Sequence, residues 1–593
     1  MLAVYEKRLT KTPTRLALLV GMLLLAVTCV TTLVLEPLTV WFEDQWWPIS
    51  ADAIAGNWLI DHARFFKNFQ GFDNQIITAS GAFVSAIVAM AQTAWRGDVQ
   101  AAVYRALNFA LATAAPATII CYLIAMAGEE IVDTRPHVEG MRLLHRQSGL
   151  NHLRQVMAKE SGRAKPRLLI APDFMISKLR ELRGILVAGA IGSGKTRICL
   201  FIIDAVLDMI RQAPEHRVRL LIHDTTGEIL QGLPLPDNAF AALHGARPGG
   251  WAWAQGRDVL TMTDAEAVGD AMAPKTQEGI WGAGAAVFLA AAQIKCQHDL
   301  GTAWGIPEFY DTLLEDPIAL KSVYEKIYPI GAALIEIDPS TGGLSKTTVS
   351  FLLTFRAAVL RFLRPLAENW RGVPNDKKFS FIEWLEDRNP NQPMVVVLQR
   401  SGKYPELSAA WIGAIVDTVA GHANDEAFPN SQDRRIFLAL EELATLGRLR
   451  NLSTLLDTGR NKGIGVICAS IQEIEQLKIH YGELEARTIL KRFRTKIICQ
   501  QVLDDETDAF SKAFIGKKTV VSVTESRTIT NDKEGRSRTT SQNDQHLEVP
   551  SVRGERLAHD LGVFGNRVRA IVAGAEDPVQ LEWPVTIWPR RRR

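Results

Sequence analysis

A glycine-rich stretch at residues 189–196 reads Gly-Ala-Ile-Gly-Ser-Gly-Lys-Thr. Its spacing is typical of a phosphate-binding loop, in which glycines let backbone N–H groups face an anion at a helix N-terminus. In this pattern the lysine reaches the β- and γ-phosphates and the threonine holds Mg²⁺. We therefore predict a site for ATP and Mg²⁺, with Lys195 catalytic and Thr196 a metal ligand. The residues predicted to contact the nucleotide are Gly189, Ala190, Ile191, Gly192, Ser193, Gly194, Lys195 and Thr196.

Two adjacent carboxylates, Glu441 and Glu442, directly follow the apolar run 436–440. Taken alone, such a pair is typical of a solvated helix start. Its position after a buried-type strand, downstream of the loop at 189–196, favours a catalytic interpretation. We predict that Glu441 helps to hold Mg²⁺ and that Glu442 polarises the attacking water. A third acidic residue, Asp224, ends another apolar run, where parallel sheets place ligand-facing groups.

Two further polar residues lie in this part of the chain. Arg460 stands in a predicted glycine-flanked turn, where it could reach the nucleotide of a neighbouring subunit as an arginine finger. Gln472 follows the next predicted strand, where it could sense the γ-phosphate or orient water. The alternative is a surface arginine and a capping glutamine, and the spacing alone does not decide between them. Both are predicted here as catalytic residues.

The pattern of strands and helices that must position these side chains predicts an α/β fold. From residue 142 onward the chain alternates strand and helix patterns, except between 258 and 364, where helical periodicity replaces the strand signal. We expect an all-helical insertion there and a core sheet that is interrupted in sequence but continuous in space. The strands are predicted at 167–171, 184–188, 219–223, 394–398, 436–440, 465–469 and 496–499.

Two later segments are predicted to lack a packed structure. Residues 524–546 are polar and nearly free of large apolar side chains, which favours a flexible excursion. The four arginines at 590–593 could bind phosphate or acidic lipid, but a frayed, solvated end is the favoured interpretation.

The N-terminal part contains uncharged apolar runs of membrane-spanning length. Runs 16–35 and 106–128 are predicted to span, whereas run 74–95 is diluted by polar residues and is ambiguous. Basic residues before the first run and the ATP site after the last one both belong in the cytoplasm, which requires an even number of crossings. We therefore predict a membrane anchor at 1–130 with an extracytoplasmic loop. Pairing 16–35 with 74–95 is the alternative.

Composition limits the other possibilities. The net charge of the 593 residues is only +2, so any contact with nucleic acid must come from local patches. The cysteines show neither paired nor metal-type spacing, which favours buried thiols in a reducing compartment. They are Cys29, Cys121, Cys199, Cys296, Cys468 and Cys499.

The motifs resemble those of the type IV secretion coupling proteins of the TraD/TraG class. The resemblance implies a RecA-like P-loop motor core, an all-alpha domain, a two-helix transmembrane anchor, and a homo-hexamer in the bacterial inner membrane with its NTPase domain in the cytoplasm. The family usually has Asp where this chain has Glu441, which would bind Mg²⁺ through a longer side chain. The matching stretches are 189–196, 441–449, 458–463, Ile471-Gln472 leading into Tyr481-Gly482, and 504–507.

This resemblance implies a domain plan and a function. The plan is an anchor at 1–130, a motor domain at 131–257 and 365–593, and an all-alpha domain at 258–364. The function is an ATPase that pumps DNA, in single-stranded form and with an attached relaxase, or another secreted protein, into a type IV secretion channel. A coupling ATPase dedicated to protein effectors and an FtsK-class translocase are the alternatives.

Other classes fit less well. An FtsK-class protein should have four anchors, a long linker and a winged-helix end, none of which is recognised. An ABC exporter needs an LSGGQ-like signature before the acidic strand, and residues 428–440 contain none. A structural membrane protein with an inactive site is disfavoured, because the lysine, the threonine and both carboxylates are present.

Overall fold

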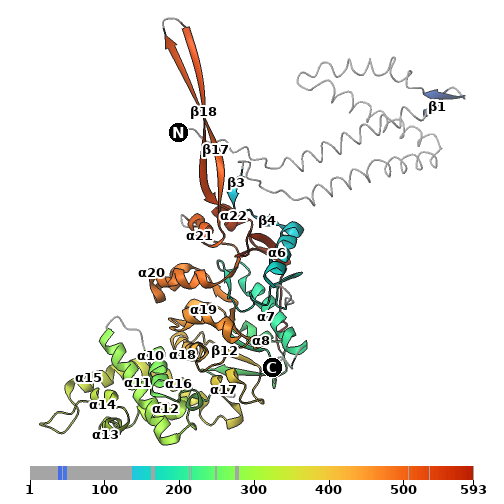
Figure 1. The fold of residues 1–593 in the computed structure, drawn as a ribbon. Helices are drawn as coiled ribbons and strands as arrows, with labels where there is room; N and C mark the ends of the chain where they lie inside the picture. Colours follow the sequence, from blue (N-terminus) through green and yellow to red (C-terminus); the bar gives the residue numbers. More distant parts are fainter. Residues whose placement is uncertain are drawn as a thin grey trace. The chain divides into compact units, whose positions relative to one another are not determined.

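The computed structural model describes residues 38–42, 45–49, 137–161, 167–212, 214, 217–247, 250–273, 279–504, 507–532 and 535–591. It divides into two units, Met1–Arg135 and Pro136–Arg593. In the first unit, strands β1 (Leu38–Phe42) and β2 (Gln45–Ile49) pair antiparallel. The second unit carries every predicted site residue and is described below (Figure 1).

The structure contradicts the predicted multi-pass localisation in the inner membrane. Within the ranges given above, no helix is long and apolar enough to cross a bilayer. The apolar runs 16–35, 74–95 and 106–128, on which the prediction rested, lie outside the described residues. The apolar helix α11 (Gly279–Leu300) is explained by packing, since most of its described apolar side chains are buried against neighbouring helices.

A five-stranded parallel sheet forms one half of the core, in the order β14-β13-β8-β12-β9. Two of its strands precede the helical segment in sequence and three follow it, so the expected continuity of the sheet in space is confirmed. The strands are β8 (Arg219–Asp224), β9 (Phe240–His244), β12 (Val395–Gln399), β13 (Ile436–Leu440) and β14 (Ile464–Ile467).

A second sheet follows the path β15-β7-β16-β20-β21-β4, with β19 paired to β20. Its strand β15 continues β14 after a single residue, Cys468, whose φ of +50° breaks the strand. One stretch of chain therefore belongs to both sheets. The strands are β4 (Leu144–His145), β7 (Ile185–Ala188), β15 (Ala469–Ile471), β16 (Thr495–Ile498), β19 (Gly562–Phe564), β20 (Arg567–Ala573) and β21 (Val579–Pro584).

Helices cover both faces of the strands, as parallel sheets require. Alternate side chains of one strand serve opposite faces: Leu221 of β8 belongs to one apolar cluster, and Leu220 and Ile222 belong to the other. The face of Leu220 is covered by α6 (Arg146–Ser161) and α7 (Lys195–Gln212). The opposite cluster includes side chains of α18 (Pro405–Asn424), α19 (Leu452–Lys462) and α20 (Ile474–Arg492).

The predicted helical segment consists of helices, and these contribute to the same apolar cluster as α18. Phe288 of α11 meets Tyr324, Phe351 and Phe355 at ring-centroid distances of 5.0 to 6.2 Å. The domain limits at 258 and 364 stay a prediction. The elements are α10 (Met262–Met272), α12 (Ile306–Leu313), α13 (Pro317–Ile327), α14 (Pro329–Ala333), α15 (Lys346–Phe355), the π-helix η3 (Arg356–Leu360) and α16 (Arg361–Trp370).

The prediction of a flexible excursion at 524–546 is wrong. Strands β17 (Lys517–Asp532) and β18 (Gly535–Pro550) pair residue for residue, from Lys517 opposite Pro550 to Asp532 opposite Gly535. β17 also pairs with β3 (His137–Gly140) at its base, near α21 (Thr507–Phe514) and α22 (Gly554–His559) (Figure 1). A two-stranded ribbon satisfies its backbone by pairing, so a polar sequence rich in threonine can form it without an apolar face.

Shorter elements complete the described fold. They are β5 (Leu169–Ala171), β6 (Phe174–Met175), α8 (Glu228–Gly232), β10 (Ala252–Trp253), α9 (Gln255–Asp258), η4 (Asn375–Lys377), β11 (Lys378–Phe379), α17 (Phe381–Glu386) and η5 (Leu443–Leu446).

Candidate nucleotide-binding site

The glycine-rich loop joins the end of β7 to the start of α7, as predicted for a phosphate-binding loop. Gly192 and Gly194 have φ angles of +77° and +93°, which L side chains rarely adopt. A Cβ on Gly189 would lie 2.7 Å from the Cβ of Cys499 and 2.7 Å from Oγ of Ser193. Backbone conformation and close packing therefore require these glycines. Ile191, at the tip, is 85% exposed.

Lys195 is folded back over the loop. Its Nζ donates hydrogen bonds to the carbonyl oxygens of Gly189 at 2.6 Å and of Ala190 at 2.9 Å. Burial lowers the pKa of Lys195, and the nearby Glu442 carboxylate opposes that shift. The ammonium group is thus held at the loop by two neutral acceptors, which an anion could replace with a stronger, charge-assisted contact.

Thr196 and Glu441 meet although they are far apart in sequence. The hydroxyl of Thr196 donates to Oε1 of Glu441 at 3.3 Å, and the backbone N–H of Thr225 donates to Oε2 at 3.1 Å. Burial raises the pKa of Glu441 to about 7, and the carboxylates of Asp224 and Glu442 add repulsion. The hydroxyl of Thr196 and the carboxylate of Glu441, the two groups expected to bind Mg²⁺, are therefore in contact. The ends of β13 and β8 bring Glu441 to the start of α7.

Glu442 and Gln472 form the second contact of the site. The backbone of Glu442 is left-handed, with a φ of +51°, and its N–H donates to Oγ of Ser470 at 2.8 Å. The side-chain amide of Gln472 donates to Oε1 of Glu442 at 2.7 Å. The unusual backbone turns the second carboxylate toward the end of β15. Positive φ at a residue other than glycine is a form of strain that clusters at functional sites.

Asp224 holds the loop that follows β8. Its buried carboxylate accepts hydrogen bonds from the N–H groups of Gly227 and Leu230, both at 2.8 Å. This fixes the loop that carries Thr225, which positions Glu441. Sequence reasoning missed the roles of Thr225 and Ser470. Their only signal is position: Thr225 directly follows β8, and Ser470 lies in β15, which pairs with β7.

Arg460 lies elsewhere than its predicted turn. It stands in the last turn of α19, and Gly459 is inside the helix, where a Cβ would lie 2.9 Å from the carbonyl oxygen of Ile464. The glycine therefore permits close packing. Burial, followed by repulsion from Arg460, lowers the pKa of Arg183, so these two arginines lie near each other. Arg183 precedes β7, whereas the phosphate-binding loop follows β7. The structure does not bring Arg460 together with the other predicted site residues of the same chain.

The prediction of a frayed C-terminal end is wrong for Arg591. Its backbone N–H donates to the carbonyl oxygen of Gln231 at 2.8 Å, and its guanidinium forms an ion pair with Asp237 at 2.8 Å and covers the ring of Phe240. Arg197, the neighbour of Thr196, also donates to the carbonyl of Thr586. The tail is held because backbone acceptors and an aromatic face are available to it. Residues 592 and 593, like 505 and 506 of the predicted 504–507 element, lie outside the described residues.

The model of the family described as the type IV secretion-system coupling protein DNA-binding domain matches residues 169–553. A search of the curated proteins finds no significant match.

Among solved structures, the bacterial conjugative coupling protein TrwBdeltaN70 in its unbound monoclinic form has 20% identity and a TM-score of 0.58, over 77% of this chain and 95% of that one. The plasmid coupling protein TrwB in complex with ADP and Mg²⁺ has 20% identity and a TM-score of 0.57, over 77% and 95%. The same protein with the non-hydrolysable ATP analogue ADPNP has 19% identity and a TM-score of 0.57, over 78% and 97%. At these identities the likeness establishes the mixed α/β, RecA-like fold.

Proposed function

Because the chain belongs to the type IV secretion-system coupling proteins, we propose that it is an ATPase motor of conjugative transfer. It would pass single-stranded DNA with an attached relaxase, or another secreted protein, to the components of a type IV secretion channel. The observation that carries this proposal is the meeting of the loop at 189–196 with Glu441 and Glu442 at one edge of the core. ATP and Mg²⁺ are the proposed ligands, a choice supported by the TrwB complexes with ADP and Mg²⁺.

The residues present fit these ligands. Lys195 would leave the carbonyls of Gly189 and Ala190 and contact the β- and γ-phosphates, since phosphate oxygens are charged acceptors. Thr196 and Glu441 would hold Mg²⁺ through oxygens that already lie in contact. When bound, the cation neutralises charge that develops on the phosphates. A glutamate in place of aspartate supplies the same oxygen ligand.

Glu442 would accept the proton of the attacking water. Its carboxylate must keep a fixed direction to do so, and the amide of Gln472 supplies that constraint. The hydrogen bond from its own N–H to Ser470 holds the backbone that carries it. Glu442 and Gln472 thus have separate proposed roles, the first as general base and the second as the residue that positions it.

Arg460 is proposed to act on a neighbouring subunit in a homo-hexamer. It stands at the opposite end of β7 from its own phosphate-binding loop, which argues against a role in that site. An arginine supplied in trans stabilises negative charge in the transition state of phosphoryl transfer. Hydrolysis would then require two subunits, one with the loop and one with the arginine.

The proposal is tested with Lys195→Ala. We expect ATP hydrolysis and conjugative transfer to be lost while the protein stays folded, because, among the described residues, the Nζ of Lys195 donates its hydrogen bonds to two loop carbonyls. Lys491→Ala, an exposed lysine on α20, is the matched control and should transfer normally. Normal transfer by a folded Lys195→Ala protein would exclude the motor function.

A further inference from the structure

A polar side chain lies in the middle of the five-stranded sheet. His223 is on β8, the central strand, and only 1% of it is exposed. Its register partners are Leu440 on β13 and Leu398 on β12, which are also buried. Burying an imidazole between apolar side chains costs free energy unless its polar atoms find partners. Packing alone therefore does not account for a histidine at this position.

His223 contacts the backbone of the predicted metal ligand Glu441. Burial lowers the pKa of His223 to about 4, a hydrogen bond with the backbone of Glu441 opposes this shift, and the charge of Arg400 adds to it. A hydrogen bond that favours the charged imidazole is one that the imidazole donates, so the acceptor is the carbonyl oxygen of Glu441. Nδ1 has no hydrogen-bond partner within the described residues, so the donor is Nε2. At pH 7 the imidazole is therefore neutral, with its proton on Nε2.

The peptide group between Glu441 and Glu442 is held at both ends. Its carbonyl oxygen accepts from the imidazole of His223 and, at 3.1 Å, from the hydroxyl of Thr225. Its N–H donates to Oγ of Ser470 at 2.8 Å. A peptide group is planar, so contacts at its two ends fix the orientation of the whole unit. Side chains from the end of β8 and from β15 thus hold one peptide plane.

The orientation of this peptide group decides where both carboxylates lie. Glu441 follows β13, and its carboxylate accepts from the hydroxyl of Thr196 on α7. The next residue, Glu442, has a φ of +51°, and its carboxylate accepts from Gln472 instead. A positive φ outside glycine persists only where the surrounding structure holds it. If the peptide group were free to rotate, the φ of Glu442 could become negative and its carboxylate would leave Gln472.

We propose that His223 is a positioning residue for ATP hydrolysis, which holds the peptide group between Glu441 and Glu442 so that their carboxylates keep separate places. This inference rests on the proposed function. Successive side chains of a strand alternate between faces, so His223 shares the face of Leu221, whereas α7 covers the opposite face. His223 is therefore no ligand of the nucleotide or the metal, and its effect on the reaction passes through the backbone.

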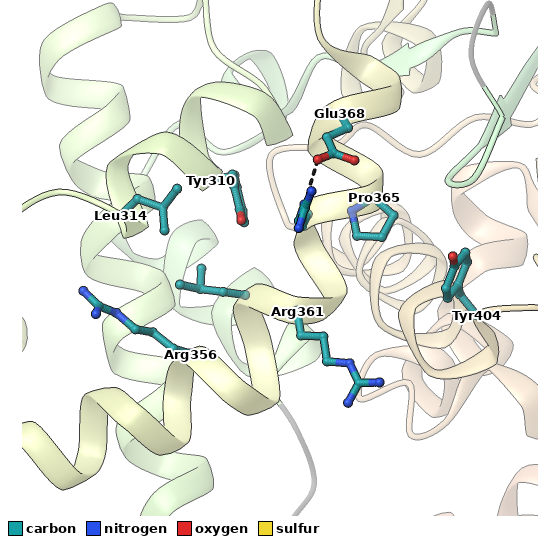
Figure 2. A pocket seen from close by; sticks show the side chains of 9 residues that line it. Tyr310, Leu314, Arg356, Arg361, Pro365, Glu368 and Tyr404 are labelled. Atoms are coloured by element: carbon teal, nitrogen blue, oxygen red, sulfur yellow. Dashed lines mark hydrogen bonds and ion pairs between the residues drawn. The ribbon is translucent and has the colours of Figure 1, made fainter.

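Arg400 is the charged residue that acts on His223. It follows β12, and its Nε is buried without a hydrogen-bond partner among the described residues. Arg400 also begins the short loop to Tyr404, which lies on the wall of a pocket of about 600 Å³. Figure 2 shows that Arg356 and Arg361 on this wall point away from each other, so the pocket presents no converging charges. The charge of Arg400 disfavours the imidazolium form of His223, which keeps the imidazole a single donor.

Steady-state ATP hydrolysis by the full chain tests this role with His223→Leu, which keeps apolar packing but cannot donate a hydrogen bond. The turnover number should fall about 10- to 100-fold, because displacement of a catalytic group by about 1 Å has an effect of this size. The KM for ATP should stay within about twofold of the parent value, since the phosphate-binding loop is unaltered. The thermal midpoint should stay the same or rise, because a buried imidazole with an unpartnered Nδ1 is removed.

Two further substitutions identify the nitrogen that acts. The amide of glutamine reaches the place of Nε2, whereas the amide of asparagine reaches the place of Nδ1. His223→Gln should therefore restore most of the turnover that His223→Leu loses, and His223→Asn should not. The matched control is His244→Asn on β9, at another buried histidine. Nδ1 of His244 accepts the N–H of Ala246, an asparagine oxygen can do the same, and turnover should not change.

Normal turnover in His223→Leu would overturn the positioning role. A fall in both turnover and thermal midpoint, or equal activity of the glutamine and asparagine variants, would overturn it as well, since these results assign His223 to the stability of the sheet. The proposed function would survive each of these outcomes as long as the parent chain hydrolyses ATP and Lys195→Ala does not. Absence of ATP hydrolysis by the parent chain would overturn the proposed function and the role of His223 together.

Discussion

Gln472 donates a hydrogen bond from its side-chain amide to the carboxylate of Glu442, 30 residues earlier in the chain, over 2.7 Å. The contact crosses from the end of β15 to the end of β13, two strands that belong to different sheets. Glu442, the acceptor, has a left-handed backbone. The direction of its carboxylate is therefore set both by the φ of Glu442 and by the amide of Gln472. The pair therefore links the two halves of the core at the site of the proposed chemistry.

Gln472→Ala should lower the ATP turnover number about 10- to 100-fold while nucleotide affinity stays near that of the parent. A misdirected base costs catalysis on this scale, but Gln472 is not proposed to contact the phosphates. Steady-state hydrolysis and binding of a fluorescent ATP analogue measure the two effects separately. Gln472→Asn is the matched variant, since it retains an amide that is too short to reach. A Gln472→Ala protein with normal turnover would show that Glu442 needs no such support.

Arg460→Ala should bind ATP normally and hydrolyse it slowly, because the arginine is proposed to act across a subunit boundary. Mixing this variant with Lys195→Ala subunits should restore part of the activity, since a mixed ring contains interfaces with one intact loop and one intact arginine. The measurement is hydrolysis against mixing ratio in purified hexamers shown to be mixed. Absence of recovery at every ratio would remove Arg460 from the catalytic residues.

The free energy of unfolding should depend on pH through Lys496. It lies on β16, where burial and next the charge of Arg494 lower its pKa from 10.5 to about 8. Between pH 8 and 10.5 the unfolded chain binds more protons at this residue, so stability should rise with pH across that window. The contribution is on the order of 3 kcal/mol at most. Lys496→Met should be more stable than the parent at pH 7, with a smaller rise, as measured by urea unfolding.

The hairpin of β17 and β18 should tolerate shortening in register. Ser526 pairs with Ser541, so replacing residues 527–540 by Asn-Gly leaves these partners opposite one another and joins them by a favoured two-residue turn. The thermal midpoint should not change, because buried Val520 lies at the retained base. Replacing 527–541 instead shifts the pairing by one residue and turns side chains to the wrong face, so this control should lower the midpoint.

The sequence allowed prediction of the parts of the site that rest on local pattern. The loop at 189–196 has the spacing of glycines, lysine and threonine that is typical of a phosphate-binding loop. Glu441 and Glu442 follow a strand that is apolar throughout. Both features are set within about ten residues. The same holds for β8, β12, β13 and β14 of the five-stranded sheet, because a strand buried on both faces appears as an unbroken apolar run. The fifth strand, β9, was not predicted.

What depends on distant contacts was missed or misplaced. Gly459 led to the prediction of a turn at Arg460. A glycine is needed there because the carbonyl oxygen of Ile464 lies close to it, and this contact exists only in the folded protein. The polar strands of the hairpin carry no burial signal, since each finds its partner in the other.

The break at Cys468 has a mechanical consequence. The phosphate-binding loop is attached to β7 in one sheet, and Glu441 and Glu442 are attached to β13 in the other. Among the described strands, the two sheets share one segment, β14 with β15, and its backbone changes direction at Cys468. Thr196 follows β7 and Glu441 follows β13, so any rotation of one sheet against the other about this segment would change the distance between these two side chains.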